Sequence, residues 1–148
     1  MENFNVARMS PGDLPAAAAL EREVFSDFWS EAMLSSGFET PSQLYFCAKE
    51  RDGALAGYAA VMIVLDEGEL LRIGVFPKFR GRGVASMLME AIVRTAEERK
   101  LAFMTLEARQ GNAPAIKLYE KYGFSPESVR KNYYRSPAED ALIMRRVF

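Results

Sequence analysis

Hydrophobic positions in the first part of the chain recur with the period of an α-helix. The segment Ser10-Pro11-Gly12-Asp13 is typical of a helix entry, and the Ala-rich stretch after it predicts a helix through about Phe25. Leu20 and Val24 are i,i+4 partners on one face of this helix. A second, short helix is predicted to begin near Ser30.

Apolar runs in the next part of the chain predict β-strands. Leu44–Lys49 and Leu55–Leu65 are two such runs, and the turn signal Arg51-Asp52-Gly53 between them predicts an antiparallel hairpin. Leu70–Phe76 predicts a third strand, which Pro77 ends.

A long helix and another strand are predicted to follow. The helix covers Gly83 to Lys100, and the strand covers Ala102 to Ala108. Glu107 lies at the exit of this strand, on the side that it shares with Phe103 and Thr105. The helix is expected to pack on the sheet through an apolar face that comprises Val84, Met87, Leu88, Ala91 and Ile92.

The remainder of the chain predicts one more helix and a closing hairpin. Asn112 suits the N-cap of a helix that runs to about Tyr122, and Gly123 can end it in the left-handed conformation. Residues 127–133 and 141–146 predict the two strands of the hairpin.

Composition indicates one folded domain with no affinity for nucleic acid. No repeat, low-complexity tract or linker divides the 148 residues, so we expect a single domain over residues 1–148. The apolar fraction of 49% and charged fraction of 26% are typical of a globular protein. With 19 Lys and Arg against 20 Asp and Glu, the chain has no broad positive field to bind a long polyanion.

The chain lacks the residues of common metal and disulfide sites. Cys47 is the single cysteine and there is no histidine, so we expect no internal disulfide and no metal site, and Cys47 is expected to be a small buried hydrophobe. The longest apolar run, Ala54–Leu65, is shorter than the roughly 20 residues that cross a bilayer. The start, with Glu2, Arg8 and Asp13, does not resemble a signal peptide. We therefore expect a cytoplasmic protein that does not associate with membranes.

The segment from Val75 to Ala85 carries the clearest chemical signal. Here a strand ends at a proline, and a helix begins after two glycines. Glycines let backbone N–H groups turn toward an anion, and a helix N-terminus adds partial positive charge, so such a loop suits a pyrophosphate. Lys78, Arg80 and Arg82 concentrate positive charge in it. The alternative is a solvated turn, and the spacing fits neither a Walker loop nor a dinucleotide-binding motif.

Two motifs resemble those of a known enzyme family. Arg80-x-x-Gly83-x-Ala85 resembles the Gln/Arg-x-x-Gly-x-Gly/Ala signature of the GNAT superfamily of N-acetyltransferases, and it lies between a strand and a helix as that resemblance requires. Asn-x-x-Ala-Ile-x-Leu-Tyr-x-x-x-Gly-Phe, which ends at Phe124, is the second specific signal. Over most of its length the chain is similar to the RimI type, the bacterial ribosomal-protein-alanine N-acetyltransferases. The other similar segments are Asp13-Leu14-Pro15-Ala16, Val64-Leu65-Asp66-Glu67, Leu106-Glu107-Ala108-Arg109 and Arg130-Lys131-Asn132-Tyr133-Tyr134.

The resemblance implies a fold and a cofactor site. It implies an α/β (α+β) GNAT fold, with a mixed, mostly antiparallel central sheet flanked by helices on both faces, and acetyl-CoA as co-substrate. Backbone groups of residues 73–75 would bind the pantetheine arm, and residues 81–86 would bind the pyrophosphate. The cofactor-binding residues that it implies are Ile73, Gly74, Val75, Arg80, Gly81, Arg82, Gly83, Val84, Ala85, Ser86 and Asn112.

The same resemblance assigns two catalytic side chains. Glu107 matches the family's proton acceptor and Tyr119 its proton donor. Acetyl transfer needs a neutral amine, a stabilised oxyanion and a proton for the departing thiolate, and a protein without histidine can supply these from carboxylate, phenol and backbone. The Val75 N–H could polarise the thioester carbonyl. The alternatives are a solvated strand-end carboxylate for Glu107 and a core aromatic for Tyr119.

The acceptor is less well defined by the sequence. An α-amine has a pKa of about 7.7–8.0, so roughly a tenth of it is neutral at pH 7 and only a modest base is needed. This favours a protein N-terminus as the acceptor. The resemblance implies that this N-terminus belongs to a ribosomal protein. Candidate acceptor-binding residues are Trp29, Glu67, Tyr133 and Tyr134, although a polar turn explains Glu67 and packing explains the aromatic residues equally simply. Where the family usually has a proline before the tryptophan, this chain has Phe28. Two other functions stay open: acetylation of a small amine or lysine, and non-catalytic binding of acetyl-CoA. The sequence does not indicate an oligomeric state.

Overall fold

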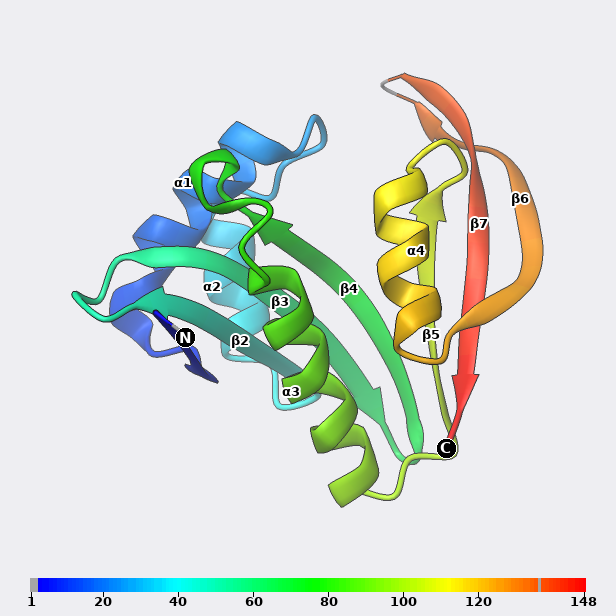
Figure 1. Ribbon diagram of the computed structural model, residues 1–148, viewed down its shortest axis with the longest axis horizontal. Helices are drawn as coiled ribbons and strands as arrows, with labels where there is room; N and C mark the ends of the chain where they lie inside the picture. Colours follow the sequence, from blue (N-terminus) through cyan, green and yellow to red (C-terminus); the bar gives the residue numbers. More distant parts are fainter. Residues whose placement is uncertain (1–2, 136) are drawn as a thin grey trace.

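The computed structural model describes residues 3–135 and 137–148, and its central feature is one seven-stranded sheet (Figure 1). The strands follow the order β1-β2-β3-β4-β5-β7-β6. In the part of the chain that the structure describes, neighbouring strands are antiparallel except β4 and β5, which are parallel. The strands are β1 (Phe4–Arg8), β2 (Gln43–Glu50), β3 (Leu55–Val64), β4 (Glu67–Val75), β5 (Phe103–Arg109), β6 (Ser125–Arg135) and β7 (Ala138–Val147).

Helices cover both faces of this sheet, as predicted. Helices α3 (Val84–Glu98) and α4 (Ala113–Lys121) contribute to the core on one face, around Leu88, Ile92 and Tyr119. Helices α1 (Leu14–Val24) and α2 (Glu31–Phe38) contribute to the core on the other face. Two 3-10 turns, η1 (Pro11–Asp13) and η2 (Pro77–Phe79), precede α1 and α3. The mixed fold predicted from the sequence is therefore confirmed.

Local signals in the sequence predicted most of these elements correctly. Ser30 caps α2 by accepting a hydrogen bond from the Met33 amide, and Asn112 caps α4 by accepting one from the Ala115 amide. Gly123 has a φ of 89°, the left-handed conformation expected after a helix. Cys47 is buried, and burial raises the pKa of its thiol to about 12.

Three details differ from the predictions. Strand β1 was not predicted; it is a short edge strand that pairs with β2. Strand β4 begins at Glu67, three residues earlier than expected, because a tight turn joins it to β3 and Val64 pairs with Glu67. The prediction for the apolar face of α3 was partly wrong, because it included Met87, which is only half-buried, and omitted Met89 and Val93, which are buried. Ala91 is half-buried and packs against the core, as predicted.

A β-bulge in β4 changes which residues face which helices. Ala60 pairs with Arg72 and Val61 pairs with Leu70, so Leu71 is the extra residue. Leu70 consequently packs with α3, while Arg72, two positions later, turns to α1 on the opposite face. None of the helices in the two described ranges is long and apolar enough to cross a membrane.

Candidate active site

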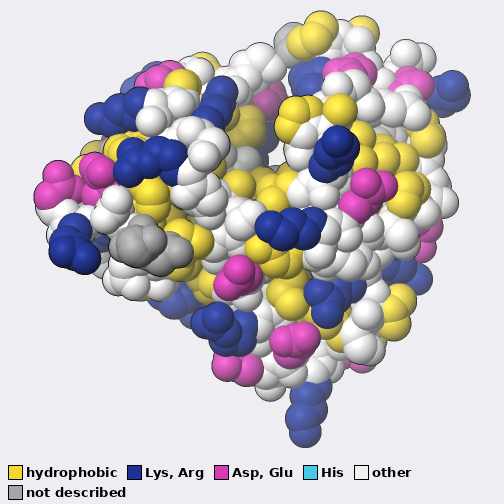
Figure 2. Space-filling model, in the orientation of Figure 1, with side chains coloured by type: hydrophobic (Ala, Val, Ile, Leu, Met, Phe, Trp, Pro, Cys, Tyr) yellow, Lys and Arg dark blue, Asp and Glu magenta, His cyan; other side chains and the backbone are white. Residues whose placement is uncertain are grey.

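The two parallel strands separate halfway along their length and open a cleft. The pairing of β4 with β5 covers only Glu67–Leu70 against Phe103–Leu106. Beyond it β4 continues beside β3 and β5 continues beside β7, so the strands diverge as Figure 1 shows. Between them lies a cleft of about 730 Å³, and Figure 2 shows the surface hollowed between the two halves of the molecule. Residues from the α1–α2 connection, β4, α3, β5, α4 and β6 line it.

Strand β4 presents backbone groups to this cleft. The Phe76 amide donates to the Ala56 carbonyl of β3, and hydrogen bonding alternates along an antiparallel pair, so the N–H and C=O groups of Ile73 and Val75 point away from β3. In agreement, the Val75 carbonyl accepts a hydrogen bond from Arg80 Nε at 3.2 Å. Since β5 no longer lies alongside, the amides of Ile73 and Val75 point to the cleft side.

Gly74 also lines the cleft, but its backbone N–H and C=O groups point toward β3, where it pairs with Tyr58. A Cβ there would lie 2.9 Å from Leu20 Cδ2 and 3.0 Å from Phe25 Cε2. A larger residue at this position would have to displace the side chains of Leu20 and Phe25. Its predicted hydrogen bond to the cofactor stays a prediction.

The glycine loop ends beside the cleft at the N-terminus of α3. Gly81 and Gly83 have φ angles of 76° and 83°, and space is open where a Cβ would lie, so backbone conformation rather than crowding favours glycine. Within the described ranges no side chain caps α3, which leaves amides of its first turn available to an anion.

The predicted residues of the loop differ in their positions. Arg80 and Ala85 line the cleft, whereas Val84 is buried in the core and the Ser86 carbonyl accepts a hydrogen bond from the Tyr122 hydroxyl. The Arg82 guanidinium lies 4.9 Å from the centre of the Phe4 ring and 5.7 Å from that of Phe79. The roles of residues 81–84 and Ser86 in binding stay predictions.

Glu107 approaches the cleft from the face that α1 and α2 cover. It alternates along β5 with Leu106 and Ala108, which are buried toward α3 and α4. Its side chain is 22% exposed, and Arg130 Nη1 lies 3.4 Å from Glu107 Oε2. A hydrogen bond to Glu107 raises the pKa of the Tyr133 hydroxyl, and burial together with the charge of Glu107 raises that of Glu69.

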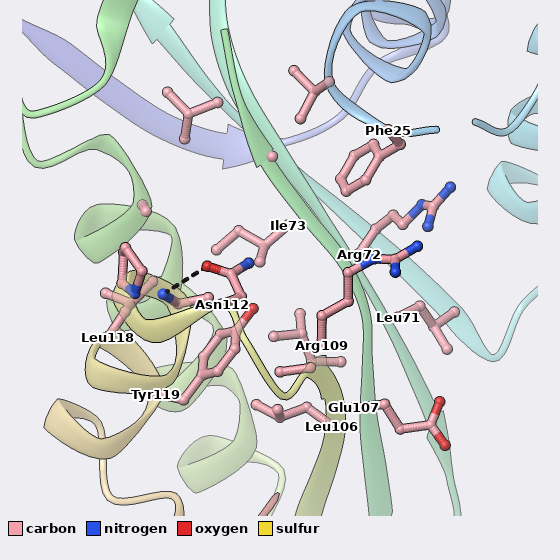
Figure 3. A pocket seen from close by; sticks show the side chains of 18 of the residues that line it. Phe25, Leu71, Arg72, Ile73, Leu106, Glu107, Arg109, Asn112, Leu118 and Tyr119 are labelled. Atoms are coloured by element: carbon pink, nitrogen blue, oxygen red, sulfur yellow. Dashed lines mark hydrogen bonds between the residues drawn. The ribbon is translucent and has the colours of Figure 1, made fainter. Parts of the chain in front are cut away.

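Tyr119 approaches from the opposite face, on α4. The end of this helix fixes its place: the Phe124 amide donates to the Tyr119 carbonyl, the Gly123 amide donates to the Glu120 carbonyl, and the rings of Tyr119 and Phe124 lie 6.4 Å apart. Figure 3 shows the Tyr119 hydroxyl directed toward Asn112 and Ile73, while the carboxylate of Glu107 points away from it. Burial, and then the nearby Tyr134, raise the pKa of Tyr119 to about 12, so its hydroxyl stays protonated at neutral pH.

The predicted acceptor-binding residues do not all reach the cleft. Tyr134 lines it, with its ring centre 4.3 Å from the Arg109 guanidinium, and burial and then Glu107 raise its pKa to about 12. Tyr133 is exposed beside Glu107. Glu67 is exposed at the paired end of β4, and Trp29 packs on Arg72 behind the lining. Their part in acceptor binding stays a prediction.

Sequence reasoning missed Glu21 and Arg72 as partners. Arg72 lines the cleft and forms an ion pair with Glu21, whose carboxylate is 0% exposed. A signal for Glu21 exists, because it lies one position after Leu20 on the buried stripe of α1, where a carboxylate needs a partner. No local signal identifies Arg72 as the partner of Glu21, because the bulge at Leu71 decides on which face of the sheet its side chain lies.

Comparisons with known proteins identify the family of this chain. The model of the family described as "Acetyltransferase (GNAT) family" matches residues 14–124. The ribosomal protein bS18-alanine N-acetyltransferase of Salmonella typhimurium is 37% identical over 142 residues, which cover 94% of each chain. The crystal structure of the corresponding Escherichia coli enzyme superposes with a TM-score of 0.90 at 34% identity and covers 97% of this chain and 93% of that one.

A more distant structure shares the fold alone. Arabidopsis thaliana NAA60 in complex with acetyl-CoA superposes with a TM-score of 0.89 at 18% identity, over 98% of this chain and 99% of that one. The match over residues 14–124 and the identity to relatives across nearly the full length establish the family. This chain belongs to the GNAT family and is an N-acetyltransferase that uses acetyl-CoA as its co-substrate.

Proposed function

We propose that this enzyme acetylates the N-terminal α-amine of a protein, and that its acceptor is ribosomal protein bS18. Relatives 36–37% identical to it over 94% of the chain carry the name of bS18-alanine N-acetyltransferases. The observation that carries the proposal is the cleft itself. Residues from both faces of the sheet line it, with Glu107 on one face and Tyr119 on the other, so two substrates can meet between β4 and β5.

The residues present fit acetyl-CoA. Cleft-facing backbone groups of Ile73 and Val75 suit the pantetheine arm, which would form strand-like hydrogen bonds with them. The uncapped first turn of α3, entered through Gly81 and Gly83, suits a pyrophosphate. Bound acetyl-CoA supplies the activated acetyl thioester. The Val75 amide would donate to the carbonyl oxygen as negative charge develops on it.

Glu107 would act as the general base and Tyr119 as the general acid. The carboxylate accepts a proton from the acceptor ammonium, directly or through water, and the neutral amine then attacks the thioester carbonyl. An α-amine with a pKa of about 7.7–8.0 requires little help to lose its proton near pH 7. The Tyr119 hydroxyl, which burial keeps protonated, would protonate the departing thiolate. The proton that the attacking nitrogen loses as the amide forms would restore this hydroxyl through water.

The enzyme is expected to be a single domain that works in the cytoplasm. The strands of the described residues form one continuous sheet, which supports a single catalytic domain over residues 1–148. A bS18 acceptor implies that the enzyme works in the cytoplasm, where ribosomes are assembled. The near-neutral balance of 19 basic and 20 acidic residues supports recognition of the protein rather than of ribosomal RNA.

Acetyl transfer to matched acceptors tests the proposal. A peptide with the first residues of bS18 is compared with the same peptide blocked at its N-terminus, a lysine-containing peptide and a polyamine, with coenzyme A release as the rate. Mass spectrometry locates the acetyl group. We expect turnover only with the free N-terminus. Faster turnover of lysine or the polyamine would refute the α-amine assignment, and release with none of the four would refute the choice of bS18.

A further inference from the structure

A buried carboxylate on α1 organises one wall of the cleft. Glu21 is 0% exposed, and its carboxylate accepts hydrogen bonds from Arg72 Nε at 3.1 Å, Arg72 Nη2 at 3.0 Å and the Trp29 amide at 2.8 Å. The Tyr58 hydroxyl of β3 donates to it as well. These bonds join α1, β3, β4 and the α1–α2 connection at one point.

Arg72 in turn binds the segment Phe25–Trp29, which connects α1 to α2. Its guanidinium lies between two rings, 4.2 Å from the centre of Phe25 and 4.5 Å from that of Trp29. Arg72 Nη2 donates to the Asp27 carbonyl at 2.8 Å, and Arg72 Nη1 lies 3.5 Å from Asp27 Oδ1. The connection is thus attached to β4 through rings, backbone and charge.

The attached segment forms part of the cleft wall. Phe25, Ser26 and Asp27 line the cleft, and so do Leu71 and Arg72 of β4 (Figure 3). Arg72 lies on the face of the sheet that Glu107 also uses, opposite the face covered by α3 and α4. The network therefore lies at the wall of the cleft on the Glu107 face of the sheet, opposite the face of α3 and α4.

We infer that Glu21 and Arg72 are positioning residues for the acceptor: their ion pair holds the segment Phe25–Trp29 against β4 in the conformation that binds the amine substrate. Stability alone does not require such a pair, because well-packed apolar residues replace buried ion pairs at little or no cost in folding free energy. A planar, bidentate guanidinium between two rings instead fixes the orientation of the segment. The assignment of this face to the acceptor rests on the proposed function.

Three variants and one control test this inference. Glu21→Gln weakens the network, and Arg72→Lys keeps the charge but loses the planar fork. The double variant Glu21→Met with Arg72→Met replaces the pair by apolar side chains. The control, Asp13→Asn, breaks the ion pair of Asp13 Oδ1 with Lys49 Nζ, 2.7 Å apart at the other end of α1, outside the cleft lining.

The readouts separate acceptor binding from cofactor binding and from stability. We expect the acceptor KM to rise about tenfold in all three variants, because a displaced wall misplaces the amine, while the acetyl-CoA Kd from calorimetry stays within about twofold. The melting temperature should fall in Glu21→Gln and recover in the double variant, whose acceptor KM should nevertheless stay raised. Asp13→Asn should lower the melting temperature and leave the acceptor KM unchanged.

Two outcomes would overturn the inference. One is recovery of the acceptor KM together with stability in the double variant, which would make the pair purely structural. The other is an equal change in acceptor KM and acetyl-CoA Kd. The assay uses whichever amine the wild-type enzyme acetylates, so a failure of bS18 as acceptor is seen in the wild type and leaves this test intact.

Discussion

The two walls of the cleft present different chemistry to their ligands. Strand β4 offers backbone amides at Ile73 and Val75, and its side chains mainly serve packing on either side. The opposite wall, formed by β5, α4 and β6, offers the side chains of Glu107, Tyr119 and Tyr134. Apart from Arg72, we therefore expect the β4 wall to tolerate side-chain changes that preserve its backbone, and the opposite wall to be sensitive to the loss of single functional groups.

The largest expected effect tests the sensitive wall. Glu107→Gln removes the proposed base but keeps the size of the side chain, so kcat should fall about 100- to 10,000-fold, the usual range for general base catalysis. The acetyl-CoA Kd, measured by calorimetry, should change less than about twofold, because Glu107 lies on the face away from α3 and α4. A kcat within threefold of wild type, on the order of 0.6 kcal/mol, would return Glu107 to the role of a solvated carboxylate.

The next effect concerns the proposed acid on the same wall. Tyr119→Phe keeps the ring contact with Phe124 and removes only the hydroxyl, so the fold should persist while kcat falls about 10- to 100-fold. Single-turnover measurements of coenzyme A release should show the loss in the chemical step. Tyr122→Phe is a matched control, because it removes the neighbouring hydroxyl, which donates to the Ser86 carbonyl outside the cleft lining. Unchanged turnover in Tyr119→Phe would remove the acid assignment.

A smaller effect is expected when the backbone of the β4 wall is changed. Val75→Pro deletes an N–H that points away from β3, so the sheet keeps its hydrogen bonds while acetyl-CoA binding loses one, about a tenfold rise in Kd. Val75→Ala keeps the N–H and should stay within about twofold of wild type. Equal losses in the two variants would mean that the side chain, not the amide, binds the cofactor.

The smallest effect is on the pH dependence of stability. Burial raises the pKa of Tyr119 to about 12, from a usual value of 10.0. The stabilisation that this shift represents is complete below pH 10, where the unfolded chain also keeps its proton, and is lost as the pH rises toward 12. Urea unfolding should show that, between pH 10 and 12, the free energy of unfolding of Tyr119→Phe falls by about 1 to 2 kcal/mol less than that of the wild type. An identical loss in both proteins would place the alkaline sensitivity elsewhere, for example at Cys47.

Sequence patterns were most reliable where the structure depends on neighbouring residues. The Asn112 cap and the left-handed Gly123 together place Tyr119 and Phe124, and each is decided within a few residues of backbone. The strand that ends before Pro77 and the helix that begins at Val84 follow from local proline and glycine preferences. The exit position of Glu107 on β5 follows from a two-residue period.

Tertiary structure decided what those patterns leave open. Strands β4 and β5 separate after Leu70 and Leu106, a choice made by their pairing with β3 and β7, and only this separation places Glu107 and Tyr119 around one cleft. The bulge at Leu71 turns Arg72 toward Glu21, 51 positions earlier in the chain. Caps and strand periods are short-range properties that the sequence by itself determines, whereas register, bulges and buried charge partners depend on the balance of packing between segments far apart in the chain, which local periodicity does not record.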